Sequence, residues 1–447
     1  IISPENVVAI LCAVANIRDQ GSEGFAYQAG IEDLFFRIEG EIIAQSGADY
    51  GGNLQLARSR NDLGQALARM ALRELLLNAY GDLLALRQVI LRRAEGFTET
   101  LMPGYTHTQP AQPVTFAHYL AGVLTFLAMD QARLSLAYSN VNESPLGAAA
   151  FTGTGFPIDR QRLAELLGFT TVITSTHHSI GAGDHLTDIS FAVQSLAIGL
   201  SRVTKDLLFL ATQEAGALHI DDSFIQISSI MPQKRNPVVL EHLRARLSRT
   251  IGAAQTIALQ CHNIPYGDTQ DIEDEILPPL YEAVTTLQDC LTLYTAVFET
   301  IELHEAHLKK RAGAGFTTAT ELADALVREG GLPFRQAHKI VATMVQQAVQ
   351  ESTGAQQLTP DHLQRAAQEV LGRAIDFSGE QLERALDPHM FINARNDIGA
   401  VSSRATTALL NQLQSGLRID QEWLAAAQNK IKDSNALRHE TIAMFQI

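Results

Sequence analysis

Few cysteines and few aromatic residues are present, and each shortage argues against a class of protein. The three cysteines, Cys12, Cys261 and Cys290, are an odd number without CxxC spacing. They therefore indicate neither a disulfide framework nor a zinc knuckle, and they favour a reducing cytoplasm. Aromatic residues make up only 6% of the 447 residues, whereas alanine, leucine, glutamine and glutamate abound. Those side chains lose little freedom in a helix, so the composition predicts helices rather than sheets.

Positive charge is also scarce. The chain has 34 lysines and arginines against 49 aspartates and glutamates, a formal net charge of −15. This balance argues against nucleic acid or an anionic membrane as a partner. No membrane span is expected, because polar residues interrupt the most apolar long segment: Gln194, Ser201, Arg202 and Lys205. The first residue is not methionine and no signal-peptide pattern follows, so we expect the sequence to begin inside a longer gene product.

Long helical patterns dominate the middle of the sequence. Apolar residues recur at helical spacing over residues 62–94, 113–140, 185–216, 237–262 and 278–304. At about 1.5 Å per residue, such helices are about 40–50 Å long, far beyond the usual helix of about 11–12 residues. Several are apolar around much of their circumference, which indicates burial on more than one side, in part by other subunits.

We therefore predict an all-α fold with three helical domains. A central bundle of the five long helices would occupy residues 59–308 and carry the active-site segments. Residues 1–58 would form a smaller N-terminal helical domain that is truncated at its start. Residues 309–447 would form a small C-terminal domain of short helices, punctuated by glycine and proline. Strand signals are weak, the best of them lying at residues 171–174.

The segment between the third and fourth patterns has the composition of a mobile active-site loop. Residues 228–237 read SSIMPQKRNP, which places Ser228, Ser229, Lys234 and Asn236 close together in the chain. Pro237 sets up the start of the next helix, whose free N–H groups favour anions. The alternative is an ordinary polar connection, because loops are usually polar for solvation alone.

Three other segments are candidates for a site. Residues 103–113, PGYTHTQPAQP, hold His107 rigidly between prolines, although a lone histidine is more often structural. Residues 58–62, RSRND, could clamp a carboxylate or simply cap a helix. Residues 144–157 are rich in glycine but lack the preceding strand of a dinucleotide-binding motif, so we interpret them as a close-packed turn.

In order and type, these segments resemble the fumarase/aspartase superfamily and, within it, the argininosuccinate lyase branch. The matching motifs are SRND at 59–62, PGYTH at 103–107, PLG at 145–147, PIDR at 157–160 and SSIMPQKRNP at 228–237. The resemblance continues through ATELADALVREGGLPFRQAHK at 319–339 and covers nearly the whole chain. Members of this superfamily are mostly homotetramers with a core of twenty long helices, and their active sites draw on different subunits. The resemblance implies the same assembly here.

The implied reaction is reversible anti β-elimination of fumarate from an N-substituted aspartate, without a metal or organic cofactor. Loss of a carbon-bound proton beside a carboxylate gives a dianion, which pre-placed cations and N–H donors must stabilise. By resemblance, Ser228 is the general base and Lys234 stabilises its alkoxide, while Glu241 orients His107 at the substrate. Further positions match substrate-binding residues of the family: Ser59, Arg60, Asn61, Thr106, Ser229, Asn236 and Tyr266.

The chain departs from the argininosuccinate lyase pattern on the amine side of the site. Phe35 stands where the family usually has histidine, and residues 55–57, QLA, replace the expected His-Thr-Gly. If no gap follows Tyr266, the family's glutamine and lysine fall on Asp271 and Asp274, whose carboxylates suit a protonated amine. Alternatively, the acidic run 268–274 is a solvated helix start.

Because the amine side of the predicted site is altered, the chain most resembles the lyases of ethylenediamine-N,N′-disuccinate (EDDS). The resemblance implies cleavage of this aminopolycarboxylate to N-(2-aminoethyl)aspartate and then to ethylenediamine, with release of fumarate at each step. Argininosuccinate lyase activity and a catalytically silent structural relative are the alternatives.

Overall fold

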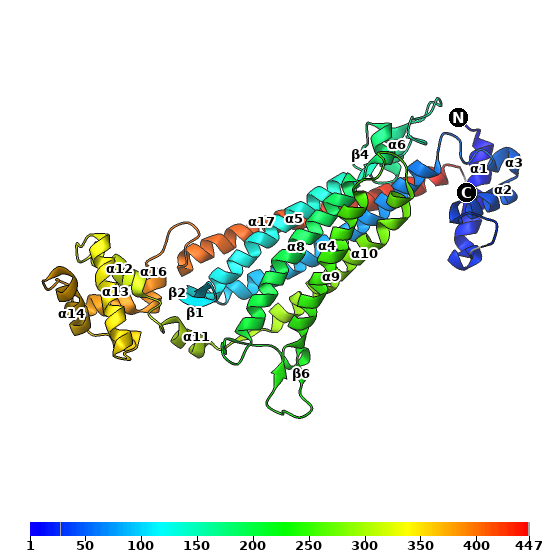
Figure 1. Cartoon of the computed structure of the whole chain (residues 1–447). Helices are drawn as coiled ribbons and strands as arrows, with labels where there is room; N and C mark the ends of the chain where they lie inside the picture. The colour runs from blue at the N-terminus through cyan, green and yellow to red at the C-terminus, as the bar shows by residue number, and fades with distance from the viewer. Residues whose placement is uncertain (27, 446–447) are drawn as a thin grey trace.

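The computed structural model describes residues 1–26 and 28–445, except for the side chains of residues 22, 23 and 273. Long helices run side by side in one elongated bundle, and smaller groups of helices lie at its two ends (Figure 1). The helices are α1 (Pro4–Gln20), α2 (Leu34–Ser46), α3 (Ala48–Gly51), α4 (Arg60–Glu95), α5 (Phe116–Val141), α6 (Arg160–Leu166), α7 (Thr176–Gly181), α8 (Asp184–Leu210), α9 (Val238–Cys261), α10 (Leu277–Thr300), α11 (Glu305–Ala312), α12 (Ala319–Arg328), α13 (Phe334–Gln350), α14 (Pro360–Leu371), α15 (Gly379–Leu386), α16 (Pro388–Asn393) and α17 (Ser403–Ala443). The all-α prediction is confirmed.

The strands are short and pair only in twos. They are β1 (Leu101–Thr106), β2 (Gln109–Thr115), β3 (Glu143–Ser144), β4 (Thr171–Val172), β5 (Leu218–His219), β6 (Gln226–Ile227), β7 (Arg235–Asn236) and β8 (Glu302–Leu303). The pairs β1–β2, β5–β8 and β6–β7 are antiparallel, and β3–β4 is parallel. Each strand lies between helices in the sequence. Strand β4 lies within residues 171–174, where the strand signal of the sequence is best.

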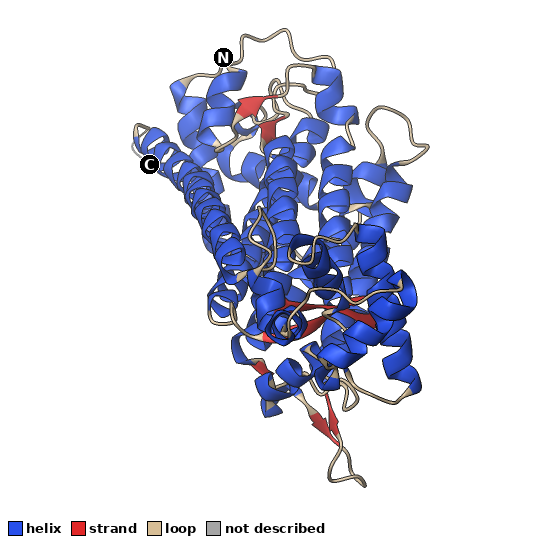
Figure 2. Ribbon diagram, turned by 90° about the vertical axis from the view of Figure 1, so that its left-hand side faces the viewer, coloured by secondary structure: helices blue, strands red, loops and turns tan. Residues whose placement is uncertain are grey.

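The five predicted long helices are α4, α5, α8, α9 and α10, and they form the central bundle. Their buried faces make one continuous apolar core, to which Leu72, Leu127, Leu200, Leu247 and Leu287 contribute from successive helices. Figure 1 labels these helices side by side, and Figure 2, turned by 90°, shows that helix dominates the molecule. The long-helix prediction is therefore confirmed to within a few residues at most ends.

A sixth long helix, α17, corrects the expectation of only short helices after residue 305. It has 41 residues and lies along α4 and α5, where Leu410 and Leu417 join the central core. Asp420 accepts a hydrogen bond from the buried Arg87 guanidinium at 2.6 Å, which ties α17 to α4. Residues 309–447 therefore include one long helix that packs on the central bundle.

The end groups have separate small cores. At one end, Ile10, Ala13, Ile17 and Ile42 of α1 and α2 pack together. At the other end, α12 to α15 bury their own apolar faces. Within the described residues, α5 alone is long and apolar enough to cross a membrane, but half of that apolar window is buried in the bundle. Core helices of bundles pass the same test of length and composition.

The start of α4 is fixed by a buried carboxylate. Ser59 caps the helix, and Asp62 Oδ1 accepts a hydrogen bond from the Ser59 N–H at 3.0 Å in a capping box. The other oxygen of Asp62 accepts from the N–H groups of Gly147 and Ala149, each at 3.0 Å. Gly147 has φ +83°, and a Cβ there would lie 2.7 Å from Ile158 and Arg160 side-chain atoms. The glycine-rich segment is thus a close-packed turn, as predicted.

Replacing Asp62 by alanine should lower the free energy of unfolding by about 2–4 kcal/mol, because the cap is lost and buried N–H groups are left without an acceptor. Thermal or denaturant unfolding measures the effect. Asp159→Ala is a matched control, because Asp159 caps α6 with one exposed hydrogen bond, and its loss should cost about 1 kcal/mol. Equal losses in the two variants would contradict the role given to Asp62.

Candidate functional site

The residues predicted to form the site lie in separate places on one chain. Ser59, Arg60 and Asn61 are at the N-terminal end of α4, whereas Thr106 and His107 belong to the β1–β2 hairpin that follows its C-terminal end. Helix α4 has 36 residues, so these two groups are separated by about 54 Å of helix. Figure 1 shows β1, β2 and β6 at the end of the bundle away from the N-terminal helices.

Ser228 lies in a hairpin loop that projects from the bundle (Figures 1 and 2). Strands β6 and β7 support the loop through only two residue pairs, 226 with 236 and 227 with 235. Ser228 Oγ accepts hydrogen bonds from the N–H groups of Met231 at 3.0 Å and Ile230 at 3.4 Å. Two N–H donors aimed at one hydroxyl oxygen favour its anionic form. Ser229 and Lys234 are exposed in the same loop, and Asn236 is half-buried at its base.

The His107 segment is a tight turn with an exposed tip. His107 and Thr108 have φ values of +50° and +64°, a left-handed conformation that is uncommon for such residues. Thr106 and His107 are both exposed. Glu241, predicted to orient His107, is exposed on the first turn of α9. In the part of one chain that the structure describes, no hydrogen bond joins these two side chains.

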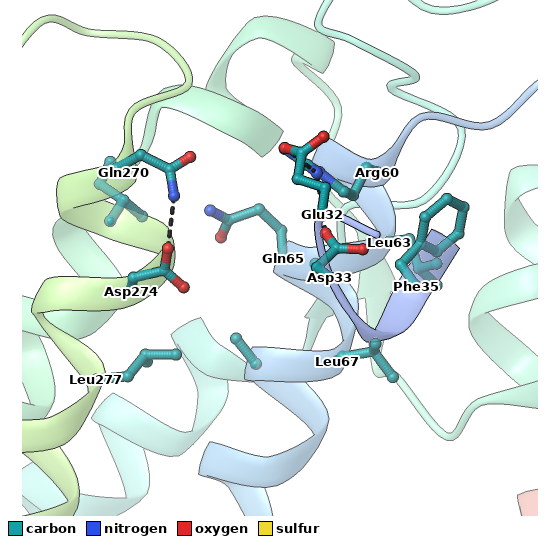
Figure 3. Close-up of a pocket in the computed structure, with 13 residues that line it drawn as sticks. Glu32, Asp33, Phe35, Arg60, Leu63, Gln65, Leu67, Gln270, Asp274 and Leu277 are labelled. Atoms are coloured by element: carbon teal, nitrogen blue, oxygen red, sulfur yellow. Dashed lines mark hydrogen bonds and ion pairs between the residues drawn. The ribbon is translucent and has the colours of Figure 1, made fainter. Parts of the chain in front are cut away.

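Arg60 lines a cavity of about 530 Å³ near the N-terminal helices (Figure 3). Its Nη1 lies 3.0 Å from Glu32 Oε1 and 2.9 Å from Asp33 Oδ2, so two carboxylates neutralise the guanidinium. Ser59 Oγ donates to Asn61 Oδ1 at 3.0 Å beside this cavity. The Arg60 guanidinium is thus already paired within one chain, and its role as a clamp for a substrate carboxylate stays a prediction.

The same cavity tests the expected changes on the amine side. Phe35 and Asp274 line it, whereas Asp271 is exposed outside it. Gln270 takes part instead, and its side-chain amide donates to Asp274. Glu273 lies outside the described side chains. The cavity wall therefore carries acidic groups. Asp274, which the ungapped alignment selected, is one of them, whereas Asp271, its other choice, lies outside.

Tyr266 belongs to a cluster of aromatic and histidine side chains that the sequence analysis missed. Its hydroxyl lies 2.5 Å from His178 Nδ1, and the Tyr266 carbonyl accepts from His177 Nε2 at 2.9 Å. The His177 and Tyr266 rings stack with centroids 5.4 Å apart. His178 Nε2 lies 3.5 Å from Asp184 Oδ2. The adjacent histidines in THHSIGAGDH, residues 176–185, were the available signal.

A buried histidine lies behind this cluster. Burial, together with the charges of Arg69 and His178, holds the pKa of His185 well below its ordinary value. Arg69 Nη2 lies 3.1 Å from His185 Nδ1, and burial lowers the pKa of Arg69 to about 10. His185 therefore stays neutral and accepts from Arg69.

Metal-ligand geometry is not found among residues 1–26 and 28–445, where no group of three or more histidine, cysteine, aspartate or glutamate side chains is arranged to hold an ion. The three cysteines are free thiols. The chemistry visible in the structure is that of hydroxyls, imidazoles, carboxylates and guanidinium groups.

Comparisons with known proteins give a consistent family. A model described as lyase matches residues 5–252, and one described as argininosuccinate lyase C-terminal matches residues 316–393. Argininosuccinate lyase 1 of Shouchella clausii is 33% identical over 437 residues, which cover 98% of this chain and 88% of that protein. Argininosuccinate lyase of Methanocaldococcus jannaschii is 36% identical over 399 residues, covering 89% and 81%. A solved variant of EDDS lyase with bound fumarate is 29% identical, covers 99% and 87%, and has a TM-score of 0.90.

The position of Tyr266 depends on the absence of a side chain at Gly181, the last residue of α7. A Cβ on Gly181 would lie 2.9 Å from Gly267 N and 3.0 Å from the Tyr266 carbonyl carbon. Gly181→Ala should therefore displace the turn that carries Tyr266 and cost about 1–3 kcal/mol of stability through overpacking. Hydrogen–deuterium exchange of residues 262–270, together with thermal unfolding, measures both effects.

Gly267→Ala is the matched control, because its Cβ would meet nothing within 4 Å. This variant adds a methyl group to Gly267, which lies against Gly181, without creating a clash. If both variants left exchange in the turn unchanged, the close approach would not be what holds Tyr266 in place.

Proposed function

Since the chain belongs to the argininosuccinate lyase branch of the fumarase/aspartase superfamily and is a carbon–nitrogen lyase that releases fumarate, we propose that it cleaves argininosuccinate to arginine and fumarate. The observation that carries this proposal is the 33% identity to an argininosuccinate lyase over 98% of the chain. The sequence comparison thus favours argininosuccinate over the EDDS that the sequence resemblance implied.

EDDS is the second candidate, and the cavity beside Arg60 favours it. Phe35 and Asp274 replace residues that the argininosuccinate lyase pattern devotes to the arginine part, and EDDS lyase is the structural relative with a TM-score of 0.90. An acidic, partly apolar wall suits a protonated amine. In either reaction the succinyl part, and hence the elimination, is the same.

In the proposed mechanism, Ser228 removes a proton from the carbon next to a substrate carboxylate. The N–H groups of Ile230 and Met231 and the ammonium of Lys234 stabilise its alkoxide. Arg60, Asn61, Ser59, Ser229 and Asn236 hold the two succinyl carboxylates through charge-assisted hydrogen bonds. Thr106 and His107, with Glu241 as the partner of the imidazole, stabilise developing charge at the substrate.

These groups can meet only if several subunits contribute, because α4 separates them by about 54 Å within one chain. The long helices expose apolar side chains that a second copy would cover, among them Met129, Phe191 and Ile198 at 55%, 55% and 46% exposure. We therefore propose a homotetramer with shared active sites. The proposal includes a cytoplasmic location, small-molecule partners only, and no metal or organic cofactor.

Substrate choice is tested by supplying argininosuccinate and EDDS separately and following fumarate by its ultraviolet absorbance. We expect release from argininosuccinate at the higher kcat/KM, because relatives that are 33% and 36% identical to this chain are named argininosuccinate lyases. Ser228→Ala is the control for enzymatic release and should lower kcat by at least about 100-fold. Release from EDDS alone would replace the first candidate by the second, and release from neither would contradict both.

Shared sites predict recovery of activity on mixing. Ser228→Ala and Arg60→Gln should each be nearly inactive, yet tetramers reassembled from both should regain part of the activity, because some sites receive both native segments. Arg60→Gln mixed with Asn61→Ala is the matched control: every α4 start then carries one substitution, so no site is intact. Equal recovery in both mixtures, or in neither, would contradict the shared arrangement.

A further inference from the structure

Asp184, His178 and Tyr266 form a chain of polar contacts. The Asp184 carboxylate lies 3.5 Å from His178 Nε2, and the opposite ring nitrogen lies 2.5 Å from the Tyr266 hydroxyl. The imidazole thus bridges a carboxylate and a phenol. The contact joins segments 88 residues apart in the sequence.

Neighbouring residues hold Asp184, His178 and Tyr266 in these positions. Ser175 caps α7 by accepting a hydrogen bond from the His178 N–H. Asp184 is the first residue of the next helix, α8. His178 and Asp184 are thus held by two successive helices. Gly181 lets the turn at residues 266 and 267 approach α7 closely. His177 stacks on the Tyr266 ring and fixes its plane. Tyr266 is nevertheless 61% exposed, so its hydroxyl is oriented from within while its outer edge remains accessible.

The two protonation states of His178 have different consequences for the phenol. The Asp184 carboxylate only accepts hydrogen bonds and lies 3.5 Å from Nε2, so it favours the tautomer that carries a proton on Nε2. In neutral His178, Nδ1 accepts from the Tyr266 hydroxyl and directs its hydrogen inward. In the imidazolium, Nδ1 donates to the phenol oxygen, and the phenol hydrogen becomes available to a ligand.

We infer that His178 and Asp184 are a relay that supplies protons to Tyr266, which protonates the nitrogen that leaves the substrate. This inference rests on the proposed function and on the assignment of Tyr266 as a substrate-binding residue, which the family resemblance implies. Tyr266 would be the catalytic acid, and His178 and Asp184 would be positioning residues that act through it.

The proposed step is balanced. The bond between carbon and nitrogen breaks, its electron pair stays on nitrogen, and the nitrogen takes the phenol proton. The Tyr266 oxygen takes the proton from His178 Nδ1, so the phenol is restored and the imidazole becomes neutral. Water then returns a proton to Nδ1 before the next turnover.

The charged and titratable groups around His178 favour this role. Asp184 attracts the imidazolium. On the buried side are His185 and Arg69, and His185 stays neutral because its pKa is held well below the ordinary value. His177 interacts with the Tyr266 ring and carbonyl and with Phe151. His178 is therefore the histidine of this cluster that has both an acidic partner and a path to the phenol.

Comparing two steps of the elimination distinguishes a proton relay from a purely structural role of His178. Ser228 removes a carbon-bound proton, whereas the relay acts only when nitrogen leaves. The substrate that the unaltered chain cleaves is incubated in deuterated water, and proton NMR follows both exchange of that carbon-bound proton and release of fumarate. His178→Asn keeps a hydrogen-bonding group near the Nδ1 position but cannot pass protons on. It should lower fumarate release about 10- to 100-fold while exchange into unreacted substrate persists.

Matched variants sharpen the result. Tyr266→Phe should likewise slow fumarate release while exchange persists, and Asp184→Asn should do so to a smaller extent. His262→Gln, which alters an exposed histidine beside the end of α9 and leaves the relay intact, should keep the ratio of exchange to release. Thermal unfolding confirms that each variant is folded.

A parallel fall of exchange and release in His178→Asn, or no change in either, would overturn the relay. The same change in the ratio of exchange to release in His262→Gln would also overturn it. Failure of the proposed function has a different signature, since the unaltered chain would then release no fumarate from either candidate substrate.

Discussion

The length of the central helices is the constraint on which the rest of the structure depends. A helix of 36 residues is stable here because its buried face packs against α5, α10 and α17 along the bundle. The same length holds the groups at its two ends too far apart to act on one small molecule. The architecture that builds the core therefore also divides the candidate site, and the proposed reaction requires other copies of the chain.

Much of this could be predicted from the sequence, because the five long helices bury continuous apolar stripes that appear as helical periodicity. Helix α17 was missed although its sequence carries a signal for it. Apolar residues recur there at helical spacing and pack on the central core: Leu410, Leu413, Leu417, Leu424 and Ile431. The site motifs at 59–62, 103–107 and 228–237 are local in sequence and were recognised as such.

Contacts between distant segments could not be predicted in the same way. The approach of Tyr266 to His178 depends on Gly181, a residue that carries no chemistry of its own. The acidic wall of the Arg60 cavity shows the same limit. The ungapped alignment selected Asp271 and Asp274, whereas the fold brings Asp274 and Gln270 to the cavity and leaves Asp271 outside it. Tertiary packing, and not local pattern, decides which neighbours along a helix face a cavity.

The hairpin that carries Ser228 has a consequence for motion. Its main-chain pairing spans two residues on each side, and Ile230 near its tip is 83% exposed, so it can change position without uncovering the leucine-rich interior of the bundle. Local rearrangement of this segment is then energetically separate from melting of the whole molecule. If Ser228 acts as proposed, heating would alter the speed of each catalytic cycle well below the temperature at which the helices come apart.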